Sequence, residues 1–360
     1  MKPLRHWPVS TAKGLIAVDK GATGAIHDVF PSAALRARRL HAQFQGSELA
    51  SPAGSAMMSR TAAQQIAIRD LKSIDDLAQL KALEKEVWGM ADEDTVPLTL
   101  AIALKTAGNI FVGAFDADKG RKNKDNDREK LVGFAFGFLG REHGQTTIHS
   151  HMLAVLDEYR HLDLGSRLKQ AQRERAVAIG VHEMTWTYDP LQSRNAHFNF
   201  AKLGVVSDTY KIDFYGPETS SMLHRNGTDR LWVRWMLNSR RVRDRLAGKN
   251  VNTRTETLDA LRLLAPLVRF DPSGKPARGN LAESLARQRI SIEIPGDILE
   301  VERTDMDLAR QWREATRWAF REALKAGFVV AEFCRSIRGQ QGPGAYLLQR
   351  GTVNELISEA

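Results

Sequence analysis

The sequence predicts a mixed α/β fold, with helices covering a mixed sheet, and three observations support this class. From residue 64 onward, segments with the two-residue period of a strand alternate with segments of helical period. Apolar residues make up 42% of the 360 residues, which is enough to bury a substantial core. The longest apolar run, 131–139, is far shorter than the roughly 18 residues that a membrane-spanning helix requires. We therefore expect a globular protein that does not cross a membrane.

Residues 1–60 are expected to form a poorly ordered N-terminal extension. No helical or strand period is sustained over 1–57, and Ala, Ser, Gly and Pro become frequent toward the end of that stretch. Its basic charge resembles an organelle transit peptide, whereas its acidic residues do not fit that class. We favour the hypothesis that translation starts at Met57 or Met58, just ahead of the first expected strand.

A first domain is predicted over 61–236, where strand and helix patterns follow one another closely. Ser73, with Asp76 three residues later, forms a capping-box-like helix start, and Gly204 is a typical helix end. The expected elements in chain order are a strand at 65–70, helices at 74–88 and 96–107, strands at 109–116, 131–140 and 146–156, a helix at 164–179, a strand at 183–188, a helix at 195–203, and strands at 207–214 and 231–236.

The rest of the chain is predicted to contain a connector at 237–280 and a smaller α/β block at 281–350. The connector begins with a basic cluster and includes an expected helix at 257–267. In the block we expect a strand around 290–294, a helix at 305–326 and strands at 328–333 and 345–349. This block is expected to pack on the first domain or to extend its sheet, and it could be a degenerate repeat of part of that domain.

Charge and cysteine content limit the partners and the compartment. The 52 Lys and Arg residues against 43 Asp and Glu give a net charge of +9, which favours anionic ligands without choosing among phosphates, nucleic acid and membrane surfaces. Cys334 is the only cysteine and cannot form an internal disulfide, so we expect a cytoplasmic protein that relies on its core.

The segment 155–169 is the most informative, because a strand there runs into a tight turn and the start of a helix. The first backbone N–H groups of a helix have no intrahelical partner, and the helix dipole adds positive potential. A diphosphate fits such a site. Within the turn, Arg160, Asp163 and Gly165 follow the spacing R/Q-x-x-G-x-G/A, with Asp in place of the first Gly.

This spacing resembles the motif with which the GNAT N-acetyltransferase superfamily wraps the pyrophosphate of acyl-CoA. The segment 195–204 is similar to the second CoA-facing helix of that family, and the order of elements over 65–236 matches its fold. The segment 185–196 resembles a little-characterised bacterial branch of predicted acetyltransferases. The resemblance covers about half of the chain.

The resemblance implies that acetyl-CoA is the co-substrate, that the acetyl group passes directly to an amine, and that no metal takes part. Backbone N–H groups near Leu153–Val155 would hold the oxyanion. Asn195 would hydrogen-bond the pantetheine, with capping of its own helix as the alternative. The residues expected to contact the cofactor are Leu153, Ala154, Val155, Arg160, His161, Asp163, Leu164, Gly165, Ser166 and Asn195.

Candidate proton acceptors lie on the strand at 146–156. Strand alternation predicts that His149, His151, Leu153 and Val155 share one face. An imidazole is the best-suited base near neutral pH, so His151 is the first candidate and His149 the second, with a buried structural histidine as the alternative for either.

Two departures from the family pattern bear on activity. Asp163 puts a carboxylate where the backbone would approach a diphosphate, and Phe200 stands where many relatives have the Tyr that protonates the leaving thiolate. Tyr188 and Tyr215 are the candidates for that missing acid, and packing of the ring is the alternative for Tyr188.

The expected function is therefore N-acetylation of a small-molecule amine or a protein amine. The alternative is a non-catalytic GNAT-fold module that binds CoA or another anion and serves regulation or interaction. We do not expect nucleic-acid binding, for which the basic cluster at 240–245 is the candidate. The candidates for a metal site, which we do not expect, are His143, His149 and His151 with Glu142 nearby. The C-terminal block is expected to shape the acceptor cleft or a homodimer contact.

Overall fold

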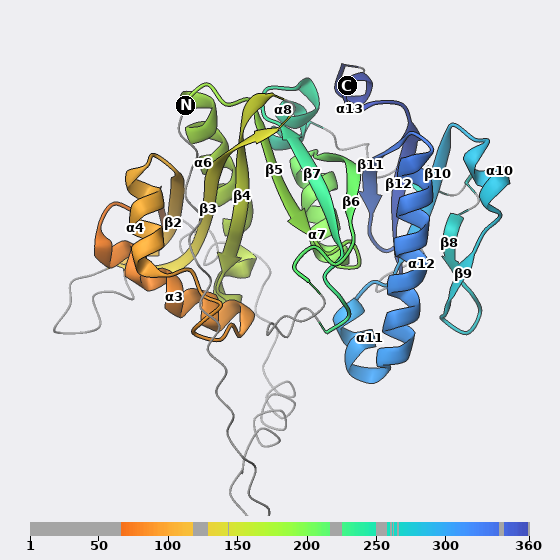
Figure 1. Ribbon diagram of the computed structural model, residues 1–360, viewed down its shortest axis with the longest axis horizontal. Coiled ribbons are helices and arrows are strands. Elements are labelled where there is room, and N and C mark those ends of the chain that lie inside the picture. The colour runs from red at the N-terminus through yellow and green to blue at the C-terminus, as the bar shows by residue number, and fades with distance from the viewer. Residues whose placement is uncertain are drawn as a thin grey trace, which may run out of the picture. The chain divides into compact units, whose positions relative to one another are not determined.

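The computed structural model describes residues 66–117, 129–142, 144–216, 225–249, 258–259, 261, 263–264, 266–337 and 342–358 (Figure 1). The predictions for residues 1–60, including the start at Met57 or Met58, lie outside these ranges.

Twelve strands of the described residues form one mixed sheet, which confirms the predicted mixed α/β class. Neighbouring strands are antiparallel except for two parallel pairs, β4 with β5 and β8 with β10. The strands in spatial order are β1 (Ile66–Asp70), β2 (Ile110–Asp116), β3 (Lys130–Glu142), β4 (Gln145–Val155), β5 (Glu183–Tyr188), β7 (Arg230–Met236), β6 (Val206–Lys211), β11 (Phe328–Cys334), β12 (Gly344–Arg350), β10 (Arg289–Ile294), β8 (Pro266–Phe270) and β9 (Pro276–Arg278).

The helices of the first half begin and end close to the predicted positions. Ser73 accepts from the backbone N–H of Asp76, whose carboxylate accepts from the Ser73 N–H, so the predicted capping box is confirmed. The helices are α3 (Ile74–Trp88), α4 (Leu98–Thr106), the 3-10 helix η1 (Asp157–Leu162), α6 (Leu164–Ala178), α7 (Ser193–Ala196), the π-helical segment η2 (His197–Leu203) and α8 (Arg240–Leu246).

Helices α3 and α6 cover opposite faces of the first half of the sheet. Trp88 of α3 packs edge-on against Phe134 of β3, with ring centroids 6.2 Å apart. Leu168 of α6 lies against the neighbouring residue Gly133 of β3, where an added Cβ would come within 3.3 Å of the leucine side chain. Successive residues of a strand point to opposite faces, so the two helices lie on different sides. We call the side of the sheet on which α3 lies the open face. On this side α3 contacts β3 and β4 but does not extend over β5, β6 and β7.

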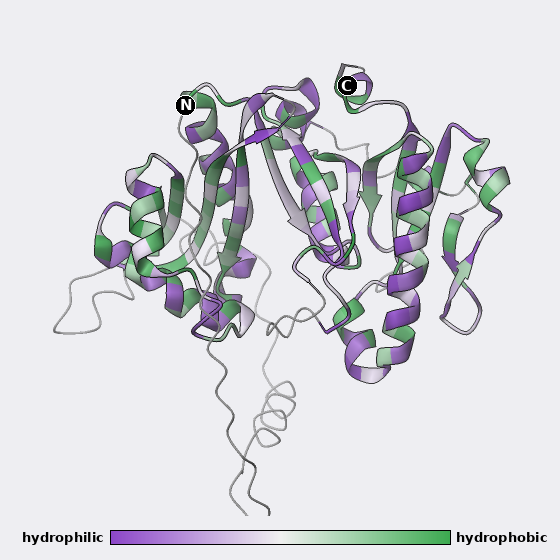
Figure 2. Cartoon of the chain, in the orientation of Figure 1, coloured by the Kyte–Doolittle hydropathy of each residue, from purple (hydrophilic) through white to green (hydrophobic). Residues whose placement is uncertain are grey.

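The second half of the sheet is covered by α12 (Met306–Lys325), which contacts β6, β8, β9, β10 and β11. Figure 2 shows apolar and polar residues alternating along this helix, and Trp312 and Phe320 on its apolar side are fully buried. These two aromatic residues therefore belong to the core. The remaining helices are α10 (Leu281–Leu285), α11 (Ile298–Thr304) and α13 (Val353–Ser358).

The structure differs from the sequence prediction at 257–267, and it adds elements that were not predicted, namely η1, α8, β8, β9, α10, α11 and α13. The expected helix at 257–267 is wrong at its end, because Pro266 and Leu267 belong to strand β8. Proline tolerates the first position of a strand, and Leu267 and Val268 are buried where β8 pairs with β10. Of the residues before Pro266 in that expected helix, 258, 259 and 261 are helical, whereas 257, 260, 262 and 265 lie outside the described part.

The second half extends the sheet of the first half through pairing of β11 with β6, at Val330 and Ser207. Arg313 of α12 donates to both carboxylate oxygens of Asp189, at 2.8 and 2.7 Å, and both side chains are nearly buried. Such a pair is costly to break from one side, because the partner charge stays buried. The ion pair therefore ties α12 to the end of β5.

No helix among the described residues is both long enough and apolar enough to cross a bilayer.

Candidate active site

Strands β4 and β5 separate after a short paired stretch. Their register pairs are Ile148 with Met184 and His149 with Thr185. Beyond them, β4 continues to Val155 and β5 to Tyr188 without further pairing between their described residues. The edge of β4 that faces β5 therefore offers backbone groups that no neighbouring strand uses, at the position where the oxyanion site was expected.

A β-bulge at His151 changes which side chains of β4 share a face. Ser150 pairs with Gly137 and Met152 with Phe136, so His151 is the extra residue. The rings of His149 and His151 lie 6.4 Å apart, as expected for one face.

The prediction that Leu153 and Val155 join the two histidines on that face is wrong. After the bulge these residues pair with Ala135 and Gly133, and Val155 packs beside Leu168 of α6 at the Gly133 position. The extra residue reverses the two-residue alternation of the strand, and the sequence carries no marker for it.

The two histidines belong to a row of aromatic rings on the open face. His149 lies 4.8 Å from the Trp232 ring, Trp232 lies 6.1 Å from Phe214, and Phe214 lies 4.8 Å from Tyr215. The Tyr215 hydroxyl is 3.4 Å from the Thr187 hydroxyl on β5. The structure thus brings His149, His151 and Tyr215 to the same face.

A hydrogen-bond chain leads from His149 across three strands. Its Nδ1 lies 3.2 Å from the hydroxyl oxygen of Thr185 on β5, and that hydroxyl donates to Oε1 of Glu142 on β3 at 3.1 Å. Burial lowers the pKa of His149 to about 4, with smaller contributions from the charges of His151 and Lys169. Desolvation also lowers the pKa of His151. Both imidazoles are therefore neutral near pH 7.

Tyr188 lies away from this face. Its hydroxyl is 2.9 Å from that of Tyr346 on β12, which donates to the carbonyl of Pro190, and burial raises the pKa of Tyr188. Phe200 is fully buried, with its ring edge-on to Tyr346. The role of Tyr188 as an acid stays a prediction.

The turn before α6 contains a non-glycine residue with a positive φ at the position of the substituted glycine. Asp163 adopts the left-handed conformation, with φ 53°, which Asp tolerates better than most residues. The first hydrogen bond within α6 runs from the Arg167 N–H to the Asp163 carbonyl, at 3.2 Å. The N–H groups of Leu164, Gly165 and Ser166 precede this bond, and the Asp163 side chain does not cap them.

The Asp163 carboxylate is held by two side chains. Its Oδ1 accepts from the Ser166 hydroxyl at 2.9 Å and from Nζ of Lys202 on η2 at 3.0 Å. Lys202 was not among the predicted site residues, although it stands in the Lys-Leu-Gly end of the segment 195–204. The lysine offsets the negative charge that was expected to repel a diphosphate.

The other expected cofactor residues surround this turn. Arg160 and His161 are exposed, and Arg160 pairs with Asp157 at 2.7 Å. Asn195 is exposed inside α7, whose N-cap is Gln192, so the capping alternative for Asn195 is wrong. A Cβ on Gly165 would meet the Phe198 ring at 3.7 Å, so the start of α6 lies close to η2.

A buried lysine lies on the other side of β4. Nζ of Lys169 donates to the Ser150 hydroxyl at 2.6 Å and stands 3.6 Å from the centre of the Trp186 ring on β5. The Ser150 hydroxyl donates to Gln172 at 2.8 Å. Complete burial lowers the pKa of Lys169 well below its usual value. This network spans the point where β4 and β5 separate, and the sequence analysis missed it.

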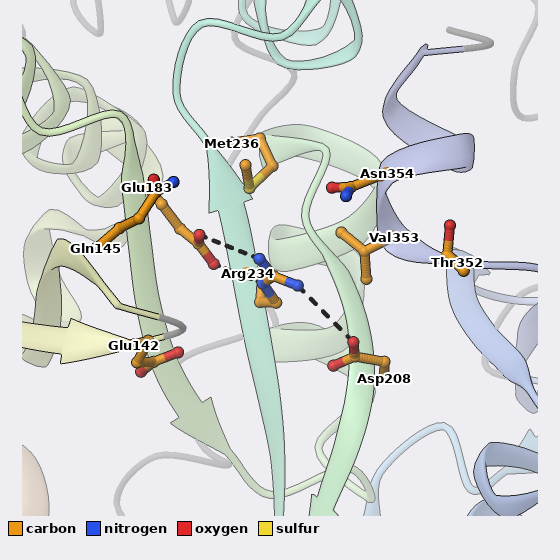
Figure 3. A pocket seen from close by; sticks show the side chains of 9 residues that line it. All are labelled: Glu142, Gln145, Glu183, Asp208, Arg234, Met236, Thr352, Val353 and Asn354. Carbon is orange, nitrogen blue, oxygen red and sulfur yellow. Dashed lines mark hydrogen bonds and ion pairs between the residues drawn. The ribbon is translucent and has the colours of Figure 1, made fainter.

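A pocket of about 370 Å³ opens at the far end of the open face (Figure 3). Arg234 bonds both carboxylate oxygens of Glu183, at 2.5 and 3.1 Å, and lies 3.8 Å from Asp208. The lining residues come from β3, β4, β5, β6, β7 and the start of α13, and they are Glu142, Gln145, Glu183, Asp208, Arg234, Met236, Thr352, Val353 and Asn354. Glu142 thus belongs both to the pocket wall and to the chain from His149.

Two other predictions concern metals and nucleic acid. Among the described residues, no three His, Cys, Asp or Glu side chains gather as metal ligands would. In the basic cluster, Arg241 and Arg245 both bind Glu332 of β11, at 2.8 and 2.5 Å, and both are largely buried. These two arginines therefore join α8 to the second half of the sheet instead of facing outward.

No family model and no curated protein matches this chain. Three similar solved structures are acetyltransferases, one of them of the GNAT family, and each aligns with about half of this chain. A GNAT-family acetyltransferase from Desulfovibrio desulfuricans is 15% identical, with 48% of this chain and 99% of that chain covered and a TM-score of 0.36. An aminoglycoside 6′-acetyltransferase of type Ii is 19% identical, with 49% of this chain and 98% of that chain covered and a TM-score of 0.37. An acetyltransferase from Salmonella typhimurium with its cofactor acetyl-CoA is 14% identical, with 48% of this chain and 95% of that chain covered and a TM-score of 0.36. At these identities the likeness concerns the fold alone.

Proposed function

We propose that the chain is an acyl-CoA-dependent N-acetyltransferase that moves the acetyl group of acetyl-CoA directly to an amine. The observation that carries this proposal is the course of β4. The strand passes the two imidazoles at His149 and His151, runs on with an edge that β5 does not pair, and leads through η1 into the start of α6. A base, hydrogen-bond donors for a carbonyl oxygen and an anion site thus follow one another along one segment.

The cofactor residues that we propose fit an acyl-CoA. The N–H groups of Leu164, Gly165 and Ser166 would bind the pyrophosphate, and Lys202 keeps the Asp163 carboxylate from opposing it. The exposed side chains of Arg160, His161 and Asn195 would contact the rest of the cofactor. The backbone of Leu153, Ala154 and Val155 would face the thioester carbonyl.

The proposed reaction is a direct transfer within a ternary complex. Acetyl-CoA supplies the acetyl group as a thioester. The amine nitrogen attacks the carbonyl carbon, an N–C bond forms, the C–S bond breaks, and the amine proton passes to one of the two imidazoles. Tyr215 is the proposed donor of a proton to the leaving thiolate, since it alone of the two tyrosine candidates lies on the open face. The acceptor is a small-molecule or protein amine.

Thermal unfolding of the full chain with acetyl-CoA, CoA or ATP tests the cofactor site. A ligand at about 100 times its dissociation constant adds roughly 2.7 kcal/mol of stability. We expect stabilisation by acetyl-CoA and CoA but not by ATP, and thiol release when an accepted amine from a panel is added. Stabilisation by CoA without thiol release from any amine would favour the alternative of a non-catalytic CoA-binding module.

A further inference from the structure

We propose that Thr185 and Glu142 are positioning residues that hold His149 with its lone pair on Nε2, which makes His149 the proton acceptor for amine acetylation. This inference rests on the proposed function, and it assigns to His149 the role that the sequence gave first to His151. In this proposal Glu142, which lines the pocket of Figure 3, orients His149 through Thr185.

The direction of the hydrogen bonds follows from the number of hydrogens. A threonine hydroxyl has one hydrogen, and that of Thr185 is donated to Oε1 of Glu142 at 3.1 Å. The hydroxyl oxygen can therefore only accept from Nδ1 of His149, at 3.2 Å. A neutral imidazole carries one hydrogen, so Nδ1–H leaves Nε2 as the proton acceptor.

Packing fixes the His149 ring in this orientation. Thr185 is fully buried, so its hydroxyl has no water to replace Glu142. The His149 ring lies 5.4 Å from the Phe138 ring and 4.8 Å from the Trp232 ring. His151, by contrast, lies on the bulge, where Phe136 and Phe138 contact its ring but no described side chain hydrogen-bonds its nitrogens. The structure therefore orients one of the two imidazoles and leaves the other unaligned.

The charged groups around His149 favour transient protonation of its imidazole. As the N–C bond forms, the amine nitrogen becomes acidic, and a neutral imidazole beside it takes the proton. The resulting imidazolium keeps its Nδ1–H bond to Thr185, and the Glu142 carboxylate at the end of the chain favours the positive charge. The other charged or titratable groups on the packed elements include His151, Lys169, Glu183, Arg234, Lys211, Arg230 and Asp208.

The test compares isosteric variants in two buried strand positions. Thr185→Val removes the hydroxyl, and we expect kcat/KM for the accepted amine to fall at least about tenfold, through kcat, while Thr185→Ser stays within about threefold of wild type. Glu142→Gln can still accept from Thr185 but lacks the charge, so we expect a smaller loss. Thr147→Val is the matched control on β4, since the Thr147 hydroxyl is buried without a partner among the described residues. It should leave kcat/KM unchanged.

Imidazole ¹⁵N NMR gives a readout that does not depend on turnover. We expect His149 to carry its hydrogen on Nδ1 in wild type and in Thr185→Ser, and to lose this preference in Thr185→Val. Hydrogen on Nε2 in wild type, or full kcat in Thr185→Val, would overturn the inference. The thermal shift with acetyl-CoA, which none of these substitutions should alter, separates its failure from failure of the proposed function. Wild type that neither binds acetyl-CoA nor releases thiol would end the proposed function, while the NMR result would still report on the tautomer.

Discussion

Two polar networks approach neighbouring residues of β4 from opposite faces of the sheet. On the α6 side, Ser150 joins Lys169 and Gln172, and all three side chains are buried. On the open face, His149 joins Thr185 and Glu142, and the chain ends at a pocket. Both networks sit where β4 and β5 separate. The difference lies in what covers them, since a helix seals the first and the second reaches a surface that a substrate can approach.

A perturbed pKa does not by itself identify a catalytic group. Burial lowers the pKa of Lys169 well below its usual value, yet its amine lies under α6 and against Trp186. The His149 pKa of about 4 has the same physical cause, desolvation, in a ring that borders the open face. Only a group that a substrate can reach can take part in catalysis, and of these two that group is His149.

The largest expected effect distinguishes the two histidines. His149→Gln should lower kcat/KM about 10²-fold, because general-base assistance is lost, whereas His151→Gln should lower it less than about tenfold. Steady-state kinetics with the accepted amine measure both. A larger loss in the His151 variant would mean that His151, and not His149, is the base.

Tyr215→Phe should reduce kcat about tenfold, because the ring keeps its place beside Phe214 but the hydroxyl is absent. Binding of acetyl-CoA, followed by the thermal shift, should not change. An unchanged kcat would remove Tyr215 from the mechanism and would limit the chemistry of the open face to its imidazoles.

Lys169→Met tests the sealed network through stability. The folded-state pKa of Lys169 is lowered, so the unfolded chain binds a proton that the folded chain releases, and stability rises with pH up to the unfolded pKa near 10.4. This residue contributes at most about 1.4 kcal/mol per pH unit. Denaturant unfolding between pH 7 and 10 should therefore show a shallower rise in Lys169→Met. Equal slopes would mean that the amine is charged in the folded state.

The smallest expected effect concerns the end of β4. Lys202→Ala should weaken acetyl-CoA binding a few-fold, because the Asp163 carboxylate loses the neighbouring ammonium in a largely exposed pair. Titration of acetyl-CoA at low and high salt measures it, and the difference should shrink at high salt. Lys211→Ala, on the far strand β6, is the matched charge control. An equal loss in both variants would mean that overall charge acts and the Asp163 pair does not.

The sequence predicted those features that local pattern controls. The capping box at Ser73, the paired imidazoles and the turn at Asp163 each depend on residues a few positions apart. The bulge at His151 escaped prediction, because register is set by the pairing of whole strands.

Long-range contacts escaped prediction for a related reason. The Thr185–Glu142 bond joins residues 43 positions apart, and the Tyr188–Tyr346 bond joins residues 158 positions apart. No periodicity connects such residues. Lys169 follows Leu168 on a helix with an apolar stripe, and only the position of Ser150 and Trp186 explains why a lysine is accepted there.

The contact between β6 and β11 has a consequence for how this chain can be divided. A fragment that ends after β7 would expose the edge of β6, and it would leave Asp189 without Arg313 and the Tyr188 hydroxyl without Tyr346. An unprotected strand edge invites pairing with other copies. The half that contains β1 to β7 is therefore expected to aggregate when produced alone, and insertions or fusions are better tolerated at the outer strand β9 than at the junction of the two halves.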